Sequence, residues 1–301
     1  MKILITGACG QLGYECLNEV VSRGHEVVGT DIRAPFDGIS DRKAPYIPLD
    51  ITDENAVTET MRRIRPDAIL HCAAWTDVDA AEIGKNREKA RAVNSGGTAV
   101  LARTAKSTDA KMLYLSTDYV FNGCGESAWK PDDREFGPLN VYGQTKLEGE
   151  RELENALDRF FIVRTSWLFG LKGGNFISTM VTAGRKHGTV RVVNDQIGMP
   201  TYARDLARLL VDMVETDRYG RYHATNERGY ISRYDLCREI YRQCGLRTEI
   251  VPVSTLEYGP TPAKRPLNSR LDTGKLAETG FAPLPDWKDA VARYLMEARL
   301  S

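Results

Sequence analysis

Tyr142 and Lys146 are the residues whose types and spacing most directly suggest chemistry. Residues four apart on a helix lie one turn above each other on the same face. A phenol has an ordinary pKa of roughly 10 and exchanges protons slowly at neutral pH. A cation beside it lowers that pKa, which suits a Tyr to proton transfer with a carbonyl or alcohol oxygen. The alternative is that Lys146 is an ordinary solvated helix lysine.

A group of glycines at the start of the chain predicts a dinucleotide site. A strand pattern over residues 2–6 leads directly into Gly7, Gly10 and Gly13, after which apolar residues recur at helical spacing. Glycines at such a turn let the backbone approach a pyrophosphate, which binds at the helix N-terminus. Asp31 ends a second strand at the position expected to bind a ribose hydroxyl. The alternative is an ordinary tight turn between a strand and a helix.

The elements that would position these residues alternate between strand and helix through the first half of the chain. Strand patterns recur at residues 46–49, 68–72, 111–115 and 160–164. Helix patterns separate them, including one long helix over residues 87–107. This alternation predicts an α/β fold with a Rossmann-type, doubly wound parallel sheet.

Ligands bind such sheets at the carboxyl ends of the strands. Thr117 follows one of these strands, so we expect it at the same edge as the glycine turn, where it could hydrogen-bond a substrate oxygen beside Tyr142. The alternative is that Thr117 only caps a turn. Together, Thr117, Tyr142 and Lys146 would suit a hydride transfer in which the phenol supplies the proton.

We place a domain boundary near residue 165, where the alternation loosens. Residues 1–165 are predicted to form the dinucleotide-binding domain, and residues 166–301 a smaller, mainly helical C-terminal substrate-binding domain. Helices are expected at residues 200–215, 232–244 and 286–299. The segment at about residues 200–225 is expected to return to the sheet of the first domain.

The composition argues against several classes of protein. Lys plus Arg equals Asp plus Glu, 41 of each, so no net field attracts nucleic acid or a membrane. No apolar run reaches the roughly 18 residues of a spanning helix, and a first strand at residue 2 leaves no room for a signal peptide. Six cysteines without a C-x-x-C pair favour free thiols and a cytoplasmic location. Four scattered histidines show no metal-ligand spacing.

Longer runs of sequence give a more specific indication than these short motifs. They include Ser-Thr-Asp-Tyr-Val-Phe at residues 116–121, Tyr-Gly-Gln-Thr-Lys at residues 142–146, Arg-Thr-Ser-Trp at residues 164–167, and Asn-Ser-Arg-Leu at residues 268–271. With these runs the chain resembles the extended short-chain dehydrogenase/reductases and, more closely, the dTDP-4-dehydrorhamnose reductase family. The resemblance covers nearly the whole chain.

The resemblance implies an NADH- or NADPH-dependent reduction of a dTDP-linked 4-keto-6-deoxyhexose, with Tyr142 as proton donor and Thr117 and Lys146 beside it. Residues implied to bind the cofactor, beyond Gly7 and Gly13, are Gly10, Gln11, Leu12, Asp31, Asp50, Ile51, Ala73, Ala74, Thr76, Leu115, Tyr142 and Lys146. Residues implied to bind the substrate are Thr117, Asp118, Val78, Trp167 and Arg265.

Two of the substrate residues have alternative interpretations. Trp167 could offer its ring as a platform for a base or sugar, or could be a core aromatic. Arg265 could bind a diphosphate in bidentate fashion, or could be a surface residue of a Pro-rich loop. For the cofactor, Asp31 favours a free ribose 2'-hydroxyl, whereas Arg33 would offset its repulsion of a 2'-phosphate. Use of both cofactors is therefore expected, with NADH at least as good.

One departure from the family concerns a metal. Some members form a dimer bridged by Mg²⁺ through clustered glutamates, which Glu15 and Glu297 match, but the third position falls on Arg204. We therefore expect no metal site, with Glu15 solvated or paired with Arg204, and a monomer or weak homodimer.

Two other functions remain open at this stage. A relative with this fold is a non-catalytic regulatory subunit of methionine adenosyltransferase, and other relatives are sugar-nucleotide epimerases. The Thr117, Tyr142 and Lys146 set argues against the first. Net consumption of NAD(P)H would distinguish a reductase from an epimerase.

Overall fold

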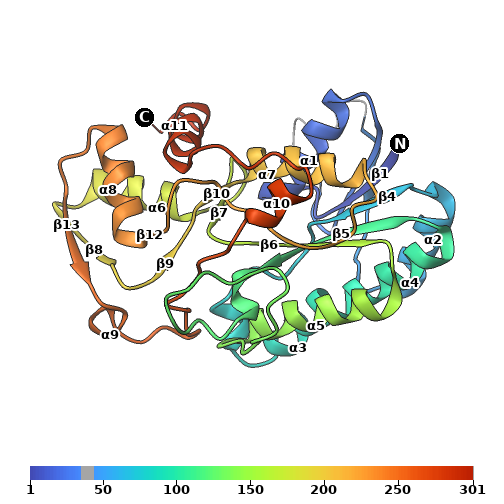
Figure 1. Ribbon diagram of the computed structural model, residues 1–301, viewed down its shortest axis with the longest axis horizontal. Coiled ribbons are helices and arrows are strands. Elements are labelled where there is room, and N and C mark those ends of the chain that lie inside the picture. The colour runs from blue at the N-terminus through green and yellow to red at the C-terminus, as the bar shows by residue number, and fades with distance from the viewer. Residues whose placement is uncertain (35–43, 301) are drawn as a thin grey trace.

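The computed structural model, which describes residues 1–34 and 44–300, is built around a seven-stranded parallel sheet (Figure 1). In spatial order its strands are β11 (Gly220–His223), β6 (Phe160–Thr165), β5 (Lys111–Thr117), β4 (Ala68–His71), β1 (Lys2–Thr6), β2 (Glu26–Asp31) and β3 (Tyr46–Pro48). The chain order reverses between β1 and β4, which is where ligands of such sheets bind. The predicted α/β fold with a doubly wound parallel sheet is confirmed.

Both faces of the sheet are buried, because successive side chains of a strand point to opposite sides. In β1, Ile3 and Ile5 enter one hydrophobic core and Leu4 enters the other. The first core is covered by α1 (Gln11–Ser22) and α7 (Ala203–Val214). The second is covered by α2 (Glu54–Ile64), α4 (Thr98–Thr108) and α5 (Val141–Ala156).

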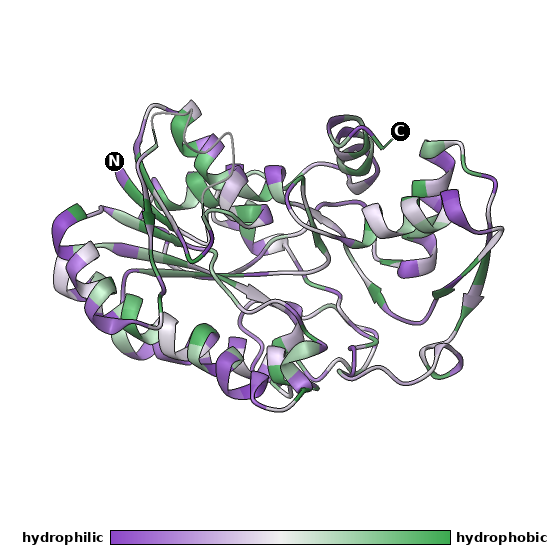
Figure 2. Ribbon diagram, turned by 180° about the vertical axis from the view of Figure 1, so that it is seen from behind, coloured by the Kyte–Doolittle hydropathy of each residue, from purple (hydrophilic) through white to green (hydrophobic). Residues whose placement is uncertain are grey.

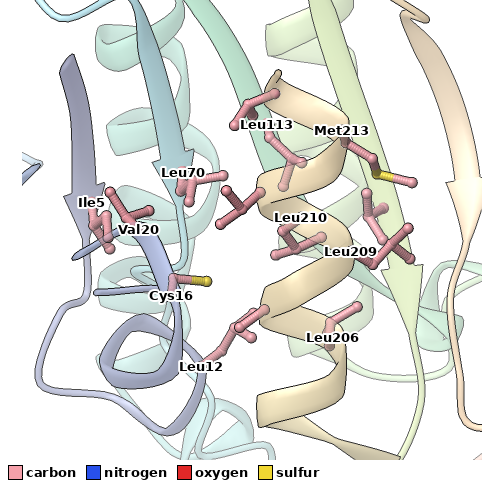
Figure 3. Close-up of a cluster of buried hydrophobic side chains, with 14 of the residues drawn as sticks. Ile5, Leu12, Cys16, Val20, Leu70, Leu113, Leu206, Leu209, Leu210 and Met213 are labelled. Atoms are coloured by element: carbon pink, nitrogen blue, oxygen red, sulfur yellow. The ribbon is translucent and has the colours of Figure 1, made fainter. Parts of the chain in front are cut away.

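Figure 3 shows the first core, where Ile5, Leu70 and Leu113 of three strands face Val20 of α1 and Leu210 of α7. All five side chains are fully buried. Burying a side chain of this size contributes about 1.5–3 kcal/mol. This packing fixes the positions of the strands, and therefore of the residues that follow them.

The C-terminal half adds shorter elements beside the sheet (Figure 1). They are β7 (Leu168–Phe169), α6 (Phe176–Lys186), β8 (Thr189–Val193), β9 (Ile197–Gly198), β10 (Thr201–Tyr202), β12 (Ile231–Ser232), α8 (Arg233–Cys244), β13 (Glu249–Val253), α9 (Thr255–Tyr258), α10 (Gly274–Glu278) and α11 (Trp287–Glu297). A third core joins α6, α8 and α11. By contrast, α7 and β11 pack on the large sheet, with β11 paired to β6.

The single helix predicted over residues 87–107 is wrong in its interior. The structure has α3 (Asn86–Arg91), a π-helical turn η3 (Ala92–Gly97) and then α4. Within η3, the Asn94 carbonyl accepts hydrogen bonds from the Thr98 and Tyr114 hydroxyls, at 2.7 and 3.2 Å. Helix α5 lies against this turn, since a Cβ on Gly149 would be 2.4 Å from the Asn94 oxygen. Tertiary packing, not local propensity, accounts for the π turn.

The helix predicted over residues 200–215 begins three residues late. Thr201 and Tyr202 instead pair with β7 as β10, and the Tyr202 N–H donates to the Asn226 side chain at 2.7 Å. Figure 2 shows hydrophilic and hydrophobic residues interspersed along the helices. Within the described residues, no helix has the length and apolar character needed to cross a membrane.

Candidate active site

The glycine turn lies between β1 and α1 and requires residues without a side chain. Gly7 has φ +69°, and a Cβ there would lie 2.7 Å from the Ala73 nitrogen, at the end of β4. Gly10 is the N-cap of α1 and makes no side-chain cap. A Cβ on Gly10 would meet only the Gly7 carbonyl oxygen, at 3.1 Å, and the distant end of Arg33. The free N-terminus of α1 is therefore open to an anionic group such as a pyrophosphate.

Asp31 at the end of β2 is buried and connects this turn to the next loop. Its carboxylate accepts hydrogen bonds from the backbone N–H groups of Cys9 and Arg33, both at 3.0 Å. The Arg33 side chain lies 3.5 Å from the same carboxylate. An ionised carboxylate can accept about four hydrogen bonds, so Asp31 retains capacity for a ribose hydroxyl, with a cation beside it.

A single cavity of about 780 Å³ brings together nearly every residue singled out in the sequence. It lies along the carboxyl edge of the sheet. The predicted residues that line it are Gly7, Gly10, Gln11, Leu12, Gly13, Asp31, Asp50, Ile51, Ala73, Ala74, Thr76, Val78, Leu115, Thr117, Asp118, Tyr142, Lys146 and Trp167. Of the predicted set, only Arg265 is not part of the lining.

The first turn of α5 positions Tyr142. Asn140 caps this helix, its side-chain oxygen accepting the Gly143 N–H at 2.8 Å. A Cβ on Gly143 would lie 2.2 Å from the Tyr119 carbonyl oxygen, so only glycine allows α5 to approach the residues after β5 so closely. The Thr117 hydroxyl lies against the Tyr142 phenol as a result, and its hydrogen bond lowers the pKa of that phenol.

The expectation that Lys146 lowers the pKa of Tyr142 is wrong. Burial raises the pKa of the Tyr142 phenol above its ordinary value, and this outweighs the opposing contribution of Thr117. Burial also lowers the pKa of Lys146 to about 7, despite the opposing effect of Glu150. The Lys146 ammonium lies 3.9 Å from the centre of the Tyr114 ring. Lys146 is 2% exposed, so the interpretation of a solvated helix lysine is excluded.

Thr117 and Asp118 lie at the carboxyl end of β5. The Thr117 hydroxyl accepts the Tyr119 N–H and donates to Asp118 Oδ1, both at 3.3 Å, so Thr117 also caps the short helix η4 (Asp118–Val120). Burial raises the pKa of Asp118 to about 6, opposed by Ser269 and Arg233. Within the described part of the chain, Asp118 Oδ2 has no hydrogen-bond partner.

Trp167 lines the cavity, but one face of its ring is covered. The Arg233 guanidinium, from the first residue of α8, lies 3.9 Å from the ring centre. Trp167 has φ +49°, an uncommon conformation for a bulky residue that tertiary packing must maintain. Arg233 also lines the cavity, and no motif in the sequence indicated it. The sequence around Arg233 indicates only that it begins a helix, because it directly follows the N-cap Ser232.

Arg265 lies outside the cavity lining and is held by Asp79. The guanidinium donates to both oxygens of that carboxylate at 2.6 Å. This bidentate pair lowers the pKa of Asp79 and raises the pKa of Arg265. Its hydrogen bonds therefore leave Arg265 poorly placed for the diphosphate expected from the sequence.

The residues considered for a metal are arranged differently from the expectation. Glu15 is 5% exposed, so it is not a solvated helix residue. Arg204 forms an ion pair with Glu297 at 2.5 Å, and the Tyr202 hydroxyl donates to the same carboxylate at 2.8 Å. Arg204 is thus paired with Glu297, and the field of Glu15 also raises the pKa of Arg204.

Comparisons with known proteins agree with the observed fold. Residues 1–300 match the family described as "RmlD substrate binding domain". The chain is 35% identical to the spore coat polysaccharide biosynthesis protein SpsK of Bacillus subtilis, over 98% of this chain and 97% of that protein. Two solved dTDP-4-dehydrorhamnose reductases are similar throughout. That of Clostridium acetobutylicum is 37% identical, covers 99% of this chain and 100% of its own, and has a TM-score of 0.90. That of Bacillus anthracis, in complex with NADP, is 35% identical, covers 98% and 99%, and has a TM-score of 0.89.

Proposed function

Because the chain belongs to the RmlD substrate binding domain family, we propose that it reduces the C4 keto group of dTDP-4-dehydro-L-rhamnose to give dTDP-L-rhamnose, with NADH or NADPH as reductant. The proposal rests chiefly on one observation. Thr117, Tyr142 and Lys146 line the same cavity as the glycine turn, so a hydride donor and a proton donor can meet there.

In this reaction Tyr142 is the general acid. The raised pKa keeps the phenol protonated at neutral pH, which is the form required to donate a proton to a keto oxygen. Thr117 donates a second hydrogen bond to the same oxygen and so orients it for protonation. Lys146 and the glycine turn would hold the reduced cofactor, which would supply the hydride needed at C4. The sugar leaves with one new C–H bond and one new O–H bond.

The glycine turn and the neighbouring strand ends fit a nicotinamide dinucleotide. Gly10 and Gln11 at the N-terminus of α1 would bind the pyrophosphate, and Asp31 the adenosine ribose. The remaining contacts would come from Gly7, Leu12, Gly13, Asp50, Ile51, Ala73, Ala74, Thr76 and Leu115. Lys146 would bind the nicotinamide ribose as well as supporting Tyr142. With Arg33 beside Asp31, both NADH and NADPH are expected to serve.

The substrate half of the cavity lies beyond Tyr142. Thr117, Asp118, Val78 and Trp167 line this half and would contact the sugar nucleotide. The unpartnered Oδ2 of Asp118 is available to accept a hydrogen bond from a sugar hydroxyl.

The test is to add a panel of nucleotide-linked 4-keto-6-deoxyhexoses to the purified protein with NADH or NADPH and to follow cofactor oxidation. We expect net oxidation with dTDP-4-dehydro-L-rhamnose, at least as fast with NADH. An epimerase would recycle its cofactor and show no net oxidation. Absence of oxidation with every sugar of the panel would contradict the proposal.

A further inference from the structure

Arg233 is a cationic side chain in the cavity that the proposed chemistry does not use. It is one of four basic residues in the lining, with Arg33, Lys89 and Lys146. Arg33 lies beside Asp31, at the adenosine end, and Lys146 lies beside the reacting centre. Lys89 is exposed, so its ammonium is solvated. Arg233 is therefore the partly buried cation of the substrate half.

The surroundings of Arg233 hold its guanidinium without satisfying it. Its guanidinium carbon lies over the Trp167 ring, 3.9 Å from the ring centre, and 5.0 Å from the centre of the Phe176 ring. Within residues 1–34 and 44–300, Arg233 is affected by Tyr119, Asp118 and Arg265 only through their fields, and it makes no hydrogen bond or ion pair. The donors of a guanidinium lie in its plane. A group stacked on a ring therefore directs its N–H bonds sideways, away from that ring.

The N–H donors of Arg233 line the cavity and are not bonded to the protein, so they are open to acceptors of a ligand in the cavity. Asp118 acts on Arg233 only through its field and forms no hydrogen bond or ion pair with it. The other arginine near this end, Arg265, is already bound by both oxygens of Asp79. Of these two arginines, Arg265 is therefore occupied by Asp79, whereas Arg233 can bind a pair of anionic oxygens of the substrate.

We propose that Arg233 binds the diphosphate of the nucleotide sugar, while Arg265 only fastens its loop to Asp79. This inference deepens the proposed function and rests on it. Guanidinium groups bind phosphate oxygens in bidentate fashion, which sets position as well as affinity. One face of Trp167 then supports the guanidinium, and the part of its ring that lines the cavity would still contact the sugar nucleotide.

The experiment measures binding instead of turnover, so that it does not depend on the reaction. Dissociation constants for dTDP, dTMP and thymidine are determined by calorimetry, with oxidised cofactor at saturation to fill the dinucleotide half. We expect Arg233→Gln to weaken dTDP binding about 10- to 100-fold, the usual value of a charged hydrogen-bonded pair. Thymidine binding should be unchanged, because it carries no phosphate.

Three further variants separate charge from structure. Arg238→Gln removes the same charge from the exposed side of α8 and should bind all three ligands as the unaltered protein does. Arg233→Lys keeps the charge without the planar fork and should lose affinity for dTDP to an intermediate degree. Arg265→Gln should weaken dTDP binding less than Arg233→Gln does. Thermal unfolding of each variant verifies that it is folded.

Two outcomes would overturn the inference. If Arg233→Gln, or Arg233→Lys should the former not fold, binds dTDP as tightly as the unaltered protein, Arg233 does not bind the diphosphate. If thymidine and dTDP are weakened equally, Arg233 serves only to pack Trp167. In both cases the proposed reduction would stand. Failure of the unaltered protein to bind dTDP at all would overturn both proposals.

Discussion

At the scale of single residues, burial decides the protonation of the proposed catalytic pair. Tyr142 and Lys146 are both enclosed, and burial favours the neutral form of each, raising one pKa and lowering the other. A neutral phenol is a proton donor, so the ground state of the free protein is already the state that a reduction needs. The pair was predictable from the sequence, but the direction of the Tyr142 shift was not: burial raises the pKa that Lys146 was expected to lower.

The first prediction concerns the Tyr142 hydroxyl. Tyr142→Phe keeps the ring and removes the proton, so turnover should fall roughly 10²- to 10⁴-fold, the usual contribution of a general acid. Cofactor affinity, measured by fluorescence titration, should barely change. Tyr219→Phe makes the same chemical change away from the cavity and serves as the control. Near-normal turnover of Tyr142→Phe would remove Tyr142 from the chemistry.

The second prediction is a pH dependence from Lys146. Its pKa of about 7 means that the side chain is charged below that pH and neutral above it. If the ammonium binds the nicotinamide ribose, kcat/KM for the cofactor should fall as the pH rises through about 7, since this ratio reports groups of the free enzyme. In Lys146→Arg the charge persists at all these pH values. That variant should lose the alkaline decline, and an unchanged decline would assign it to another group.

At the scale of elements, α5 is fastened to the sheet by a buried ion pair. Glu150 of α5 accepts two hydrogen bonds from Arg164 of β6, at 2.8 and 2.6 Å, and a third from Ser116 of β5 at 2.5 Å. Both charged side chains are at most 2% exposed. The pair holds the helix that positions Tyr142 and Lys146 against the strands that end in the cavity.

The third prediction tests this connection. Glu150→Gln leaves the Arg164 charge buried without a counter-charge, which should lower the free energy of unfolding by about 3–5 kcal/mol. Urea denaturation measures the change. Glu148→Gln, two residues earlier on the same helix, breaks a partly exposed pair with Arg91 and should cost under about 1 kcal/mol. If the free energy of unfolding falls equally in the two variants, the buried pair does not stabilise the protein more than the partly exposed pair does.

Elements with a strong local signal were predictable, and those set by distant contacts were not. Strand β1 shows its apolar pattern because both of its faces are buried. Asp53, a residue type typical of helix N-caps, caps α2 and accepts the Ala56 N–H at 3.0 Å. The π turn η3 arises from its packing against Gly149 of α5. Arg233 reaches the cavity only because α8 is placed beside Trp167, 66 positions earlier in the chain. Neither event leaves a local pattern in the sequence.

At the scale of the whole molecule, the C-terminal half of the chain contributes both to the large sheet and to a separate hydrophobic core. Helix α7 and strand β11 complete the large sheet and its cover, whereas α6, α8 and α11 form a separate core. The boundary placed at residue 165 stays a prediction.

The carboxylate of Glu297, near the end of α11, is bound by Arg204 and Tyr202. A guanidinium cannot ligate Mg²⁺ and keeps its charge at any relevant pH.

The fourth prediction follows from this pairing. Because a cation holds Glu297, EDTA should leave both the activity and the molecular mass of the protein unchanged. Light scattering with and without EDTA gives the mass, and the NAD(P)H assay gives the activity. A mass that falls by half on chelation and recovers with Mg²⁺ would contradict this expectation and indicate a metal-bridged dimer.

The most direct test of the proposed reduction follows the hydrogen itself. The protein is incubated with dTDP-4-dehydro-L-rhamnose and a cofactor carrying deuterium at the transferable position of its nicotinamide ring. The product is then analysed by NMR and mass spectrometry. We predict dTDP-L-rhamnose with one deuterium at C4 for each cofactor oxidised, and almost no product from Tyr142→Phe in the same time. A product without deuterium at C4, or an isomerised sugar formed without net oxidation of the cofactor, would contradict the reduction proposed for this protein.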